Sequence, residues 1–181
     1  MIRLSLFAAL ALLLPTLAQA EDRPTVYKTT QSHWVIMKGS KQCVAARGYE
    51  GDHFLHIGFD PVMNTVAVGV TDPNATSLKE GQEIKLHIFF FGANTVDDGW
   101  GLWDFTVGKD DDGRPMMLGA FDARDMLRDI ARSESIAFSI DAEAKRPVGL
   151  FPLKGSAAAV AALRQCSFEA AGLNPNDPFL R

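Results

Sequence analysis

The stretch HFLHIGFDPVMNTVAVGVTDPN, residues 53–74, determines what kind of fold the chain adopts. Apolar residues recur at every second position over 53–59 and 65–71, and the second run is rich in β-branched Val and Thr. Such alternation is typical of strands with one buried face, and the Asp-Pro pairs at 60–61 and 72–73 mark turns. The stretch therefore predicts two consecutive strands of an antiparallel sheet.

The same period of two continues on both sides of this stretch. Between two of the runs, the residues Lys-Asp-Asp-Asp-Gly at 109–113 predict the tip of a hairpin. The last run contains Pro, which favours an edge strand. Further strands are predicted over residues 33–37, 42–47, 83–91, 103–107, 114–118, 135–140 and 147–153.

Two segments follow a helical period instead. Asp122 stands at the N-cap position of the first, and Ser156 at that of the second, an Ala-rich run that ends near Cys166. We therefore predict a mostly β (α+β) fold, an antiparallel β-sandwich or sheet with two packed helices. The apolar stripe of the first helix consists of Ala123, Met126, Leu127, Ile130 and Ala131.

The N-terminal 20 residues have the features of an export signal. Arg3 gives a positive start, residues 4–14 are apolar, and Ala18 and Ala20 are the small residues that signal peptidase prefers before a cleavage point. We expect a signal peptide over 1–20, a single β-rich domain over 21–172 and a flexible tail over 173–181. The expected location is periplasmic or secreted.

The two cysteines, Cys43 and Cys166, are expected to form one disulfide, because an exported chain matures in an oxidising compartment. They are too far apart in sequence for a redox Cys-x-x-Cys pair. A bridge would connect an early strand to the last helix. We interpret it as structural.

Charge excludes two classes of partner. The chain has a formal net charge of −4 and no basic run. Binding to nucleic acid or to an anionic membrane surface requires clustered Lys and Arg, so neither partner is expected. No segment other than the signal is long and apolar enough to span a membrane, so no span is expected after cleavage.

The residues that could carry chemistry do not form a known motif. His56 and His87 could share a face only if their strands were neighbours, and the Asp residues at 110–112 do not fit the EF-hand spacing. Hydrolase signatures around Ser or His are absent from the sequence. We predict no catalytic residues, no metal and no cofactor, and consider an enzyme the less favoured alternative.

The candidate binding residues are aromatic and acidic. Trp100 and Trp103 lie beside glycines and close to Asp97 and Asp98. An exposed aromatic ring next to acids can bind a protein or a cationic ligand. The alternative, and the more common outcome, is that Trp100 folds back over the edge of the sheet.

Three parts of the sequence carry a resemblance to a known family: Trp34-x-Ile36 followed by Cys43-Val44-Ala45, the β-rich middle, and Leu153-Lys154-Gly155-Ser156 with the Ala-rich stretch to Cys166. With these segments the chain resembles the invasion-associated locus B family of small secreted proteins of alphaproteobacteria. The family has an additional cysteine soon after its first Trp strand, where this chain has Lys38. The resemblance implies a periplasmic or surface β-sandwich, and it assigns no functional residue.

Taken together, these features favour a non-catalytic periplasmic binding or accessory protein of the cell envelope. Its partner would be an envelope protein or a small ligand. One alternative is a small metal-dependent or hydrolytic enzyme that uses His56, His87 and the acids at Asp97 and Asp98. The other is a purely structural envelope protein.

Overall fold

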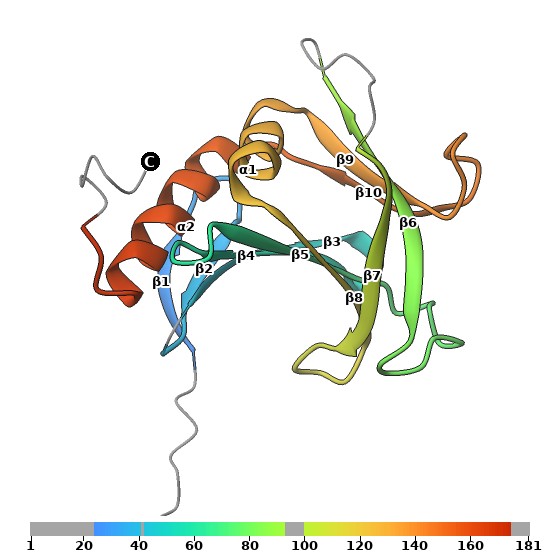
Figure 1. Cartoon of the computed structure of the whole chain (residues 1–181), viewed down its shortest axis with the longest axis horizontal. Helices are drawn as coiled ribbons and strands as arrows, with labels where there is room; N and C mark the ends of the chain where they lie inside the picture. The colour runs from blue at the N-terminus through green and yellow to red at the C-terminus, as the bar shows by residue number, and fades with distance from the viewer. Residues whose placement is uncertain (1–23, 41, 93–99, 175–181) are drawn as a thin grey trace, which may run out of the picture.

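We describe a computed structural model of the chain, which covers residues 24–40, 42–92 and 100–174. In these residues ten antiparallel strands form one sheet, and two α-helices pack on it (Figure 1). The predicted fold class, mostly antiparallel β with two packed helices, is confirmed. The strand order across the sheet is β1-β2-β3-β4-β5-β8-β7-β6-β9-β10. The strands are β1 (Thr25–Thr29), β2 (Val35–Lys38), β3 (Cys43–Tyr49), β4 (His53–Asp60), β5 (Thr65–Thr71), β6 (Glu83–Phe91), β7 (Gly101–Lys109), β8 (Pro115–Asp122), β9 (Ser135–Ser139) and β10 (Pro147–Pro152), with a short 3-10 helix, η1 (Glu50–Asp52), before β4.

The hydrophobic core lies on the face of the sheet that the helices cover. Leu55 and Ile57 of β4 and Val66, Val68 and Val70 of β5 are all fully buried there. Burial at every second position is what the alternation of these strands predicts. The sheet bends strongly, since β6 and β7 stand nearly upright on the right of Figure 1 while β2–β5 run across the middle. The core fills the inside of this bend.

The two helices, α1 (Ala123–Arg132) and α2 (Ser156–Ala170), lie against each other. Asp122 is the N-cap of α1, as predicted, and its carboxylate accepts hydrogen bonds from the backbone N–H groups of Arg124 (2.9 Å) and Asp125 (3.4 Å). α2 packs on β2, β3 and β4, and α1 packs on β5 and β8. Together they cover the core side of the first half of the sheet (Figure 1).

A clamp of three side chains fixes the segment between β10 and α2. The Tyr49 hydroxyl donates to the carbonyl of Pro152 (2.9 Å), and the guanidinium of Arg47 donates to the carbonyl of Lys154 (3.0 Å). The indole N–H of Trp34 donates to the same Lys154 carbonyl (3.2 Å). Burial raises the pKa of Tyr49 to about 12, although the nearby Arg47 lowers it, so the phenol stays protonated and can donate. The clamp joins β3 and the residue before β2 to the end of β10, the edge strand on the other side of the sheet.

The predicted disulfide between Cys43 and Cys166 is present. Both residues are fully buried, the first in β3 and the second on the inward face of α2. The bridge spans 123 residues of sequence. It therefore ties the last helix to a central part of the core.

Two local expectations are wrong. Ser156 is not the N-cap of α2: Gly155 holds that position with a φ of 79°, and the Ser156 hydroxyl instead donates to the carbonyl of Ile130 (2.6 Å). His33 is not in a strand, because its φ of 64° places it in the turn before β2.

Strand β1 was not predicted, because its residues are mostly exposed and show no buried face. Leu173, expected in the tail, packs against the core, and residues 175–181 lie outside the described part.

Candidate functional site

The face of the sheet opposite the core carries small side chains over its central strands. In β4 and β5 every second residue points to this outer face, because the residues between them fill the core. The outward positions are Phe54, His56, Gly58 and Asp60 in β4, and Ala67, Gly69 and Thr71 in β5.

Strand pairing brings the small residues together. Gly58 lies opposite Ala67, and His56 lies opposite Gly69 on one side and Ala46 on the other. Neighbouring strands are about 4.8 Å apart, so these residues make a low, continuous floor. The imidazole of His56 stands on this floor.

Two adjoining hollows open over the floor, with volumes of about 830 Å³ and about 290 Å³. Both are lined by Met37, His56, Asp110 and Asp111, so they form one continuous groove, which we call the outer groove. Its floor consists of Ala46, Gly58, Ala67, Gly69 and His56. Its walls are Met37 and Val44 on one side and Asp110, Asp111, Met116 and Leu118 on the other.

The second wall comes from the hairpin that joins β7 and β8, whose tip curves below β5 in Figure 1. Arg114 holds this tip in place. Its guanidinium donates to Asp110 (2.7 Å) and to Asp112 (2.6 Å) and lies 4.5 Å from the centre of the Phe54 ring on β4. Ion pairs and a cation–π contact thus fix the tip against the sheet, and the groove is formed before any ligand arrives.

Asp110 is the most enclosed acid of the tip. Burial raises the pKa of its carboxyl, but hydrogen bonds from the backbone and side chain of Arg114 lower it by more, so the pKa ends below its ordinary value of 3.8. The carboxylate of Asp110 also accepts the backbone N–H of Asp112 (3.0 Å). Asp110 therefore stays ionised and mainly orders the tip. Asp111, the next residue, is exposed and has no ion pair among the described residues.

His56 is the titratable group on the groove floor. Its Nε2 lies 3.3 Å from the Thr71 hydroxyl, and its ring stacks on Phe54. Burial lowers the pKa of His56 below its ordinary 6.5; the charges of Asp110 and Asp111 raise it and that of Arg114 lowers it, with burial the largest influence. The imidazole is therefore neutral at neutral pH.

The residues proposed from the sequence lie elsewhere. Trp100 is half-buried, its indole N–H donates to the carboxylate of Asp129 (3.0 Å), and its ring packs beside Phe121 at the margin of the core. Trp103 packs on the same Phe121 ring and donates its indole N–H to the carbonyl of Trp100. The two tryptophans are thus together, and Trp100 folds back over the sheet as the alternative predicted. Asp97 and Asp98 lie outside the described residues.

The histidine pair suggested for a metal or hydrolytic site is not brought together. His56 is in β4 and His87 in β6, and strands β5, β8 and β7 lie between them. Within residues 24–40, 42–92 and 100–174, no group of three or more His, Cys, Asp or Glu side chains could hold a metal ion. The alternative that joined these two histidines therefore loses its geometric basis.

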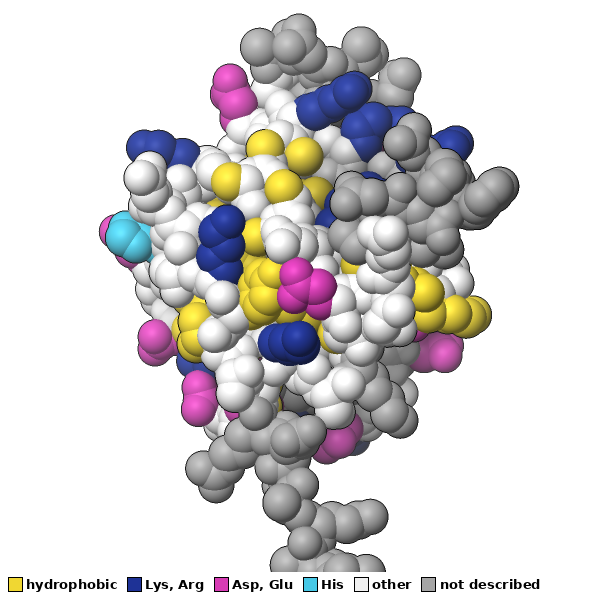
Figure 2. All heavy atoms as spheres, turned by 90° about the vertical axis from the view of Figure 1, so that its left-hand side faces the viewer, with side chains coloured by type: hydrophobic (Ala, Val, Ile, Leu, Met, Phe, Trp, Pro, Cys, Tyr) yellow, Lys and Arg dark blue, Asp and Glu magenta, His cyan; other side chains and the backbone are white. Residues whose placement is uncertain are grey.

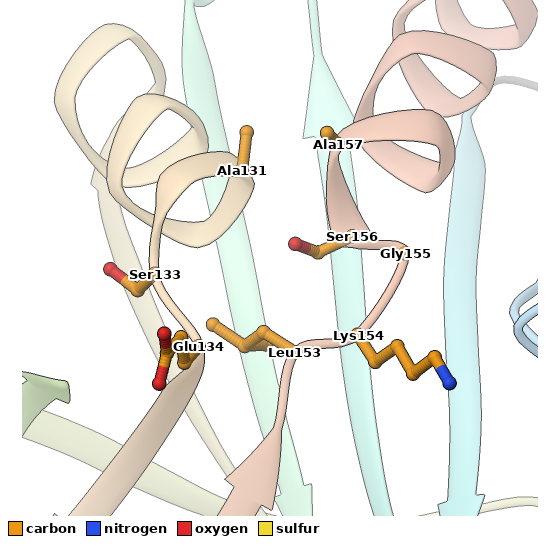
Figure 3. Close-up of a pocket in the computed structure, with 8 residues that line it drawn as sticks. All are labelled: Ala131, Ser133, Glu134, Leu153, Lys154, Gly155, Ser156 and Ala157. Atoms are coloured by element: carbon orange, nitrogen blue, oxygen red, sulfur yellow. The ribbon is translucent and has the colours of Figure 1, made fainter. Parts of the chain in front are cut away.

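A second cavity, of about 330 Å³, lies between the end of α1 and the start of α2 (Figure 3). Its polar groups do not converge on a common point. The Ser133 hydroxyl and the Lys154 side chain point away from each other in Figure 3, and the Ser156 hydroxyl is already bound to the Ile130 carbonyl. This cavity is therefore a weaker candidate than the outer groove.

On the face that includes the outer side of α2, the described residues form a mixed surface. Figure 2 shows acidic and basic side chains interspersed over it, with hydrophobic side chains in small areas between them. Such a mixed surface is typical of a solvated face. The outer groove remains the best candidate site, and the sequence carried one signal for it: the small residues at outward positions of the stretch 53–71.

Comparison with known proteins does not assign a family to this arrangement. No protein-family model, no curated protein and no solved structure matches the chain.

Proposed function

We propose that this chain is a non-catalytic, exported binding protein of the cell envelope, and that the outer groove holds its ligand. The observation that carries the proposal is the shape and chemistry of the groove: a low floor of Gly and Ala between Met-lined walls. Binding sites are typically preformed, concave and largely apolar, with a few polar groups for orientation. The outer groove has these properties, and Asp60, Asp110 and Asp111 supply negative charge at its rim.

The contacts of His56 suit a residue that orients a ligand. To activate a side-chain nucleophile, an imidazole must lie within hydrogen-bond reach of one that a substrate can approach. The described hydroxyl within reach of His56 belongs to Thr71, which is fully buried and therefore closed to a substrate. In this proposal His56 orients the ligand and does not activate a nucleophile.

Two features support export. The disulfide between Cys43 and Cys166 fits an oxidising compartment. The first 20 residues fit a signal peptide. Among the described residues, no helix has the length and apolar character needed to cross a membrane. A periplasmic location, and the resemblance to the invasion-associated locus B family, are consistent with this proposal.

The experiment fills the groove with a side chain. N-phenyl-1-naphthylamine, a neutral apolar dye that fluoresces when it leaves water, is the probe. Ala67→Phe places a large ring on the exposed floor position opposite Gly58. We expect the wild type to bind the dye and Ala67→Phe to bind at least about tenfold more weakly, since a filled pocket loses its apolar contacts.

The matched control is Ala161→Phe, the same change at an exposed position of α2. It should leave dye binding unchanged. Equal binding by Ala67→Phe and wild type would contradict the site. No dye binding by the wild type would favour the purely structural alternative.

A further inference from the structure

We infer that the ligand of the outer groove is an extended polypeptide segment with apolar side chains in the middle and a basic residue towards each end. This inference rests on the proposed function and adds the class of ligand. It is carried by three properties of the larger hollow: its direction, its walls and the balance of its charges.

The direction of the groove suits an extended chain. Its floor follows β4 from Asp60 to His56, a distance of about 13 Å at the rise of a strand. A ligand that lies along this floor therefore spans about four extended residues. The floor between these ends is almost flat, because Gly58 and Ala67 lie side by side there.

The walls suit apolar side chains of different shapes. Met37 stands on the β2 side and Met116 on the β8 side, with Val44 and Leu118 beside them. The thioether of Met116 bends over Gly69 and lies 3.2 Å from where a Cβ atom would be. Unbranched thioether side chains adapt to different partners, so such walls favour a peptide of loosely defined apolar sequence.

The charges of the larger hollow favour a basic ligand. Lys109, the basic residue among its described lining residues, is already paired with Glu80 (3.4 Å), and Asp110 is already paired with Arg114. Asp60 and Asp111 have no ion pair within the described part of the chain. Among the described lining residues, the charge that remains is therefore negative and lies at two separate points.

The smaller hollow adds no further unpaired acid among its described residues. Asp110 and Asp112 are both paired with Arg114, which also lines it. A basic residue of the ligand is therefore expected at Asp60 and at Asp111, and not beyond His56 along the smaller hollow. An ammonium or guanidinium group at each point, with apolar side chains between them, complements the larger hollow.

The apolar walls separate this ligand from a simple polyamine. A polyamine would satisfy Asp60 and Asp111 but would leave Met37, Met116 and Leu118 with little apolar surface to contact. Burial of apolar side chains contributes most of the binding free energy at such a site, whereas exposed ion pairs contribute little. The structure therefore favours the peptide.

The test uses terminally blocked hexapeptides and isothermal titration calorimetry at low salt. One probe has lysine at both ends and four Leu or Val residues between them, and the matched probe has glutamate at both ends. We expect the lysine peptide to bind at least about tenfold more tightly, with an advantage that shrinks in high salt, because exposed charges are screened.

Variants of the two acids locate the ends of the peptide. Asp60→Asn keeps the side-chain oxygen that accepts the N–H groups of Val62 and Met63, so it removes charge and preserves the turn. Asp60→Asn and Asp111→Asn should each weaken the lysine peptide by about two- to fivefold. The control is Asp104→Asn, an exposed acid on β7 that pairs with Lys85 and lies outside the groove, and it should have no effect.

The outcomes separate this inference from the proposed function. Equal affinity for the two peptides, or spermidine competing as well as the lysine peptide, would overturn the peptide assignment. If the dye still bound the wild type and not Ala67→Phe in that case, the groove would remain the site. If neither the dye nor the peptides bound, both proposals would fail.

Discussion

His56 belongs both to the central part of the sheet and to the candidate binding site. Its backbone belongs to the central strand β4, and its side chain stands among Ala46, Gly58 and Gly69 on the outer groove floor. Because the imidazole is partly removed from water, its charged form is disfavoured in the folded protein. The residue therefore links protonation both to stability and to the charge of the groove.

Stability is expected to fall on acidification through His56. Its pKa is lower in the folded state than the ordinary 6.5, so the unfolded state takes up the proton first as the pH falls. Above pH 6.5, neutral His56 makes its whole contribution to the free energy of unfolding. This contribution is lost as the pH falls from 6.5 through the lower pKa of His56 in the folded state.

Urea unfolding of the wild type and His56→Gln at pH 7.5 and 5.5 measures this contribution. The variant should lose less stability between the two pH values than the wild type. Identical pH dependence in the wild type and His56→Gln would contradict the account.

At the scale of elements, the positions of the strands and helices along the chain could be predicted better than the order in which the strands pair in the sheet. The predicted runs 65–71 and 83–91 match β5 and β6, because alternation and β-branching are local signals. β1 was missed because it has little buried surface; it is held by pairing with β2 and by the hydrogen bond from Tyr27 to Glu169 (3.0 Å).

The outer groove could not be predicted in the same way. Its second wall exists because β5 pairs with β8 and because the tip after β7 folds back over β4, and both are contacts between distant parts of the sequence. The sequence showed the small residues Gly58 and Gly69 but not what would stand beside them. Trp100 and Trp103 were predicted as binding residues because they are aromatic and lie near glycines. This pattern does not distinguish a packed ring from an exposed one.

The start of α2 depends on one glycine. Gly155 has a φ of 79°, and a Cβ atom added there would collide with the side chain of Ser32 in the turn before β2. Gly155→Ala should therefore destabilise the protein by about 2–4 kcal/mol, the sum of the left-handed backbone cost and the steric clash.

A control separates the two costs. Gly81 has a φ of 78° with open space around its Cα, so Gly81→Ala carries the backbone cost alone, about 1 kcal/mol. In the double variant Ser32→Gly with Gly155→Ala the clash is removed, and the cost of the alanine should fall towards that at Gly81. Chemical denaturation provides the free energies, and equal costs of alanine at 155 and 81 in the wild-type background would contradict this packing.

At the scale of the whole molecule, the disulfide and the clamp at β10 hold the bent sheet together. Cys43 and Cys166 close a loop of 123 residues, which limits the unfolded chain. Arg47 and Tyr49 join β3 to the segment after β10. The curvature that forms the outer groove therefore depends on contacts on the opposite side of the sheet.

Loss of the bridge should lower the free energy of unfolding substantially. The chain-entropy relation gives an upper value of about 4–5 kcal/mol for a loop of this length. The double variant Cys43→Ala with Cys166→Ala tests it by denaturant unfolding, compared with the wild type under oxidising and reducing conditions. If the double variant and the reduced wild type were as stable as the oxidised wild type, the bridge would contribute nothing.

The most direct test of the central claim, that the outer groove is the ligand site, is chemical-shift mapping by NMR during titration with N-phenyl-1-naphthylamine. The account predicts that the largest amide shifts occur at Gly58, Ala67, Gly69 and Met116, which lie together around the groove floor. Shifts concentrated at Trp100 and Trp103, with the groove unchanged, would contradict it and return the site to the residues that the sequence first indicated.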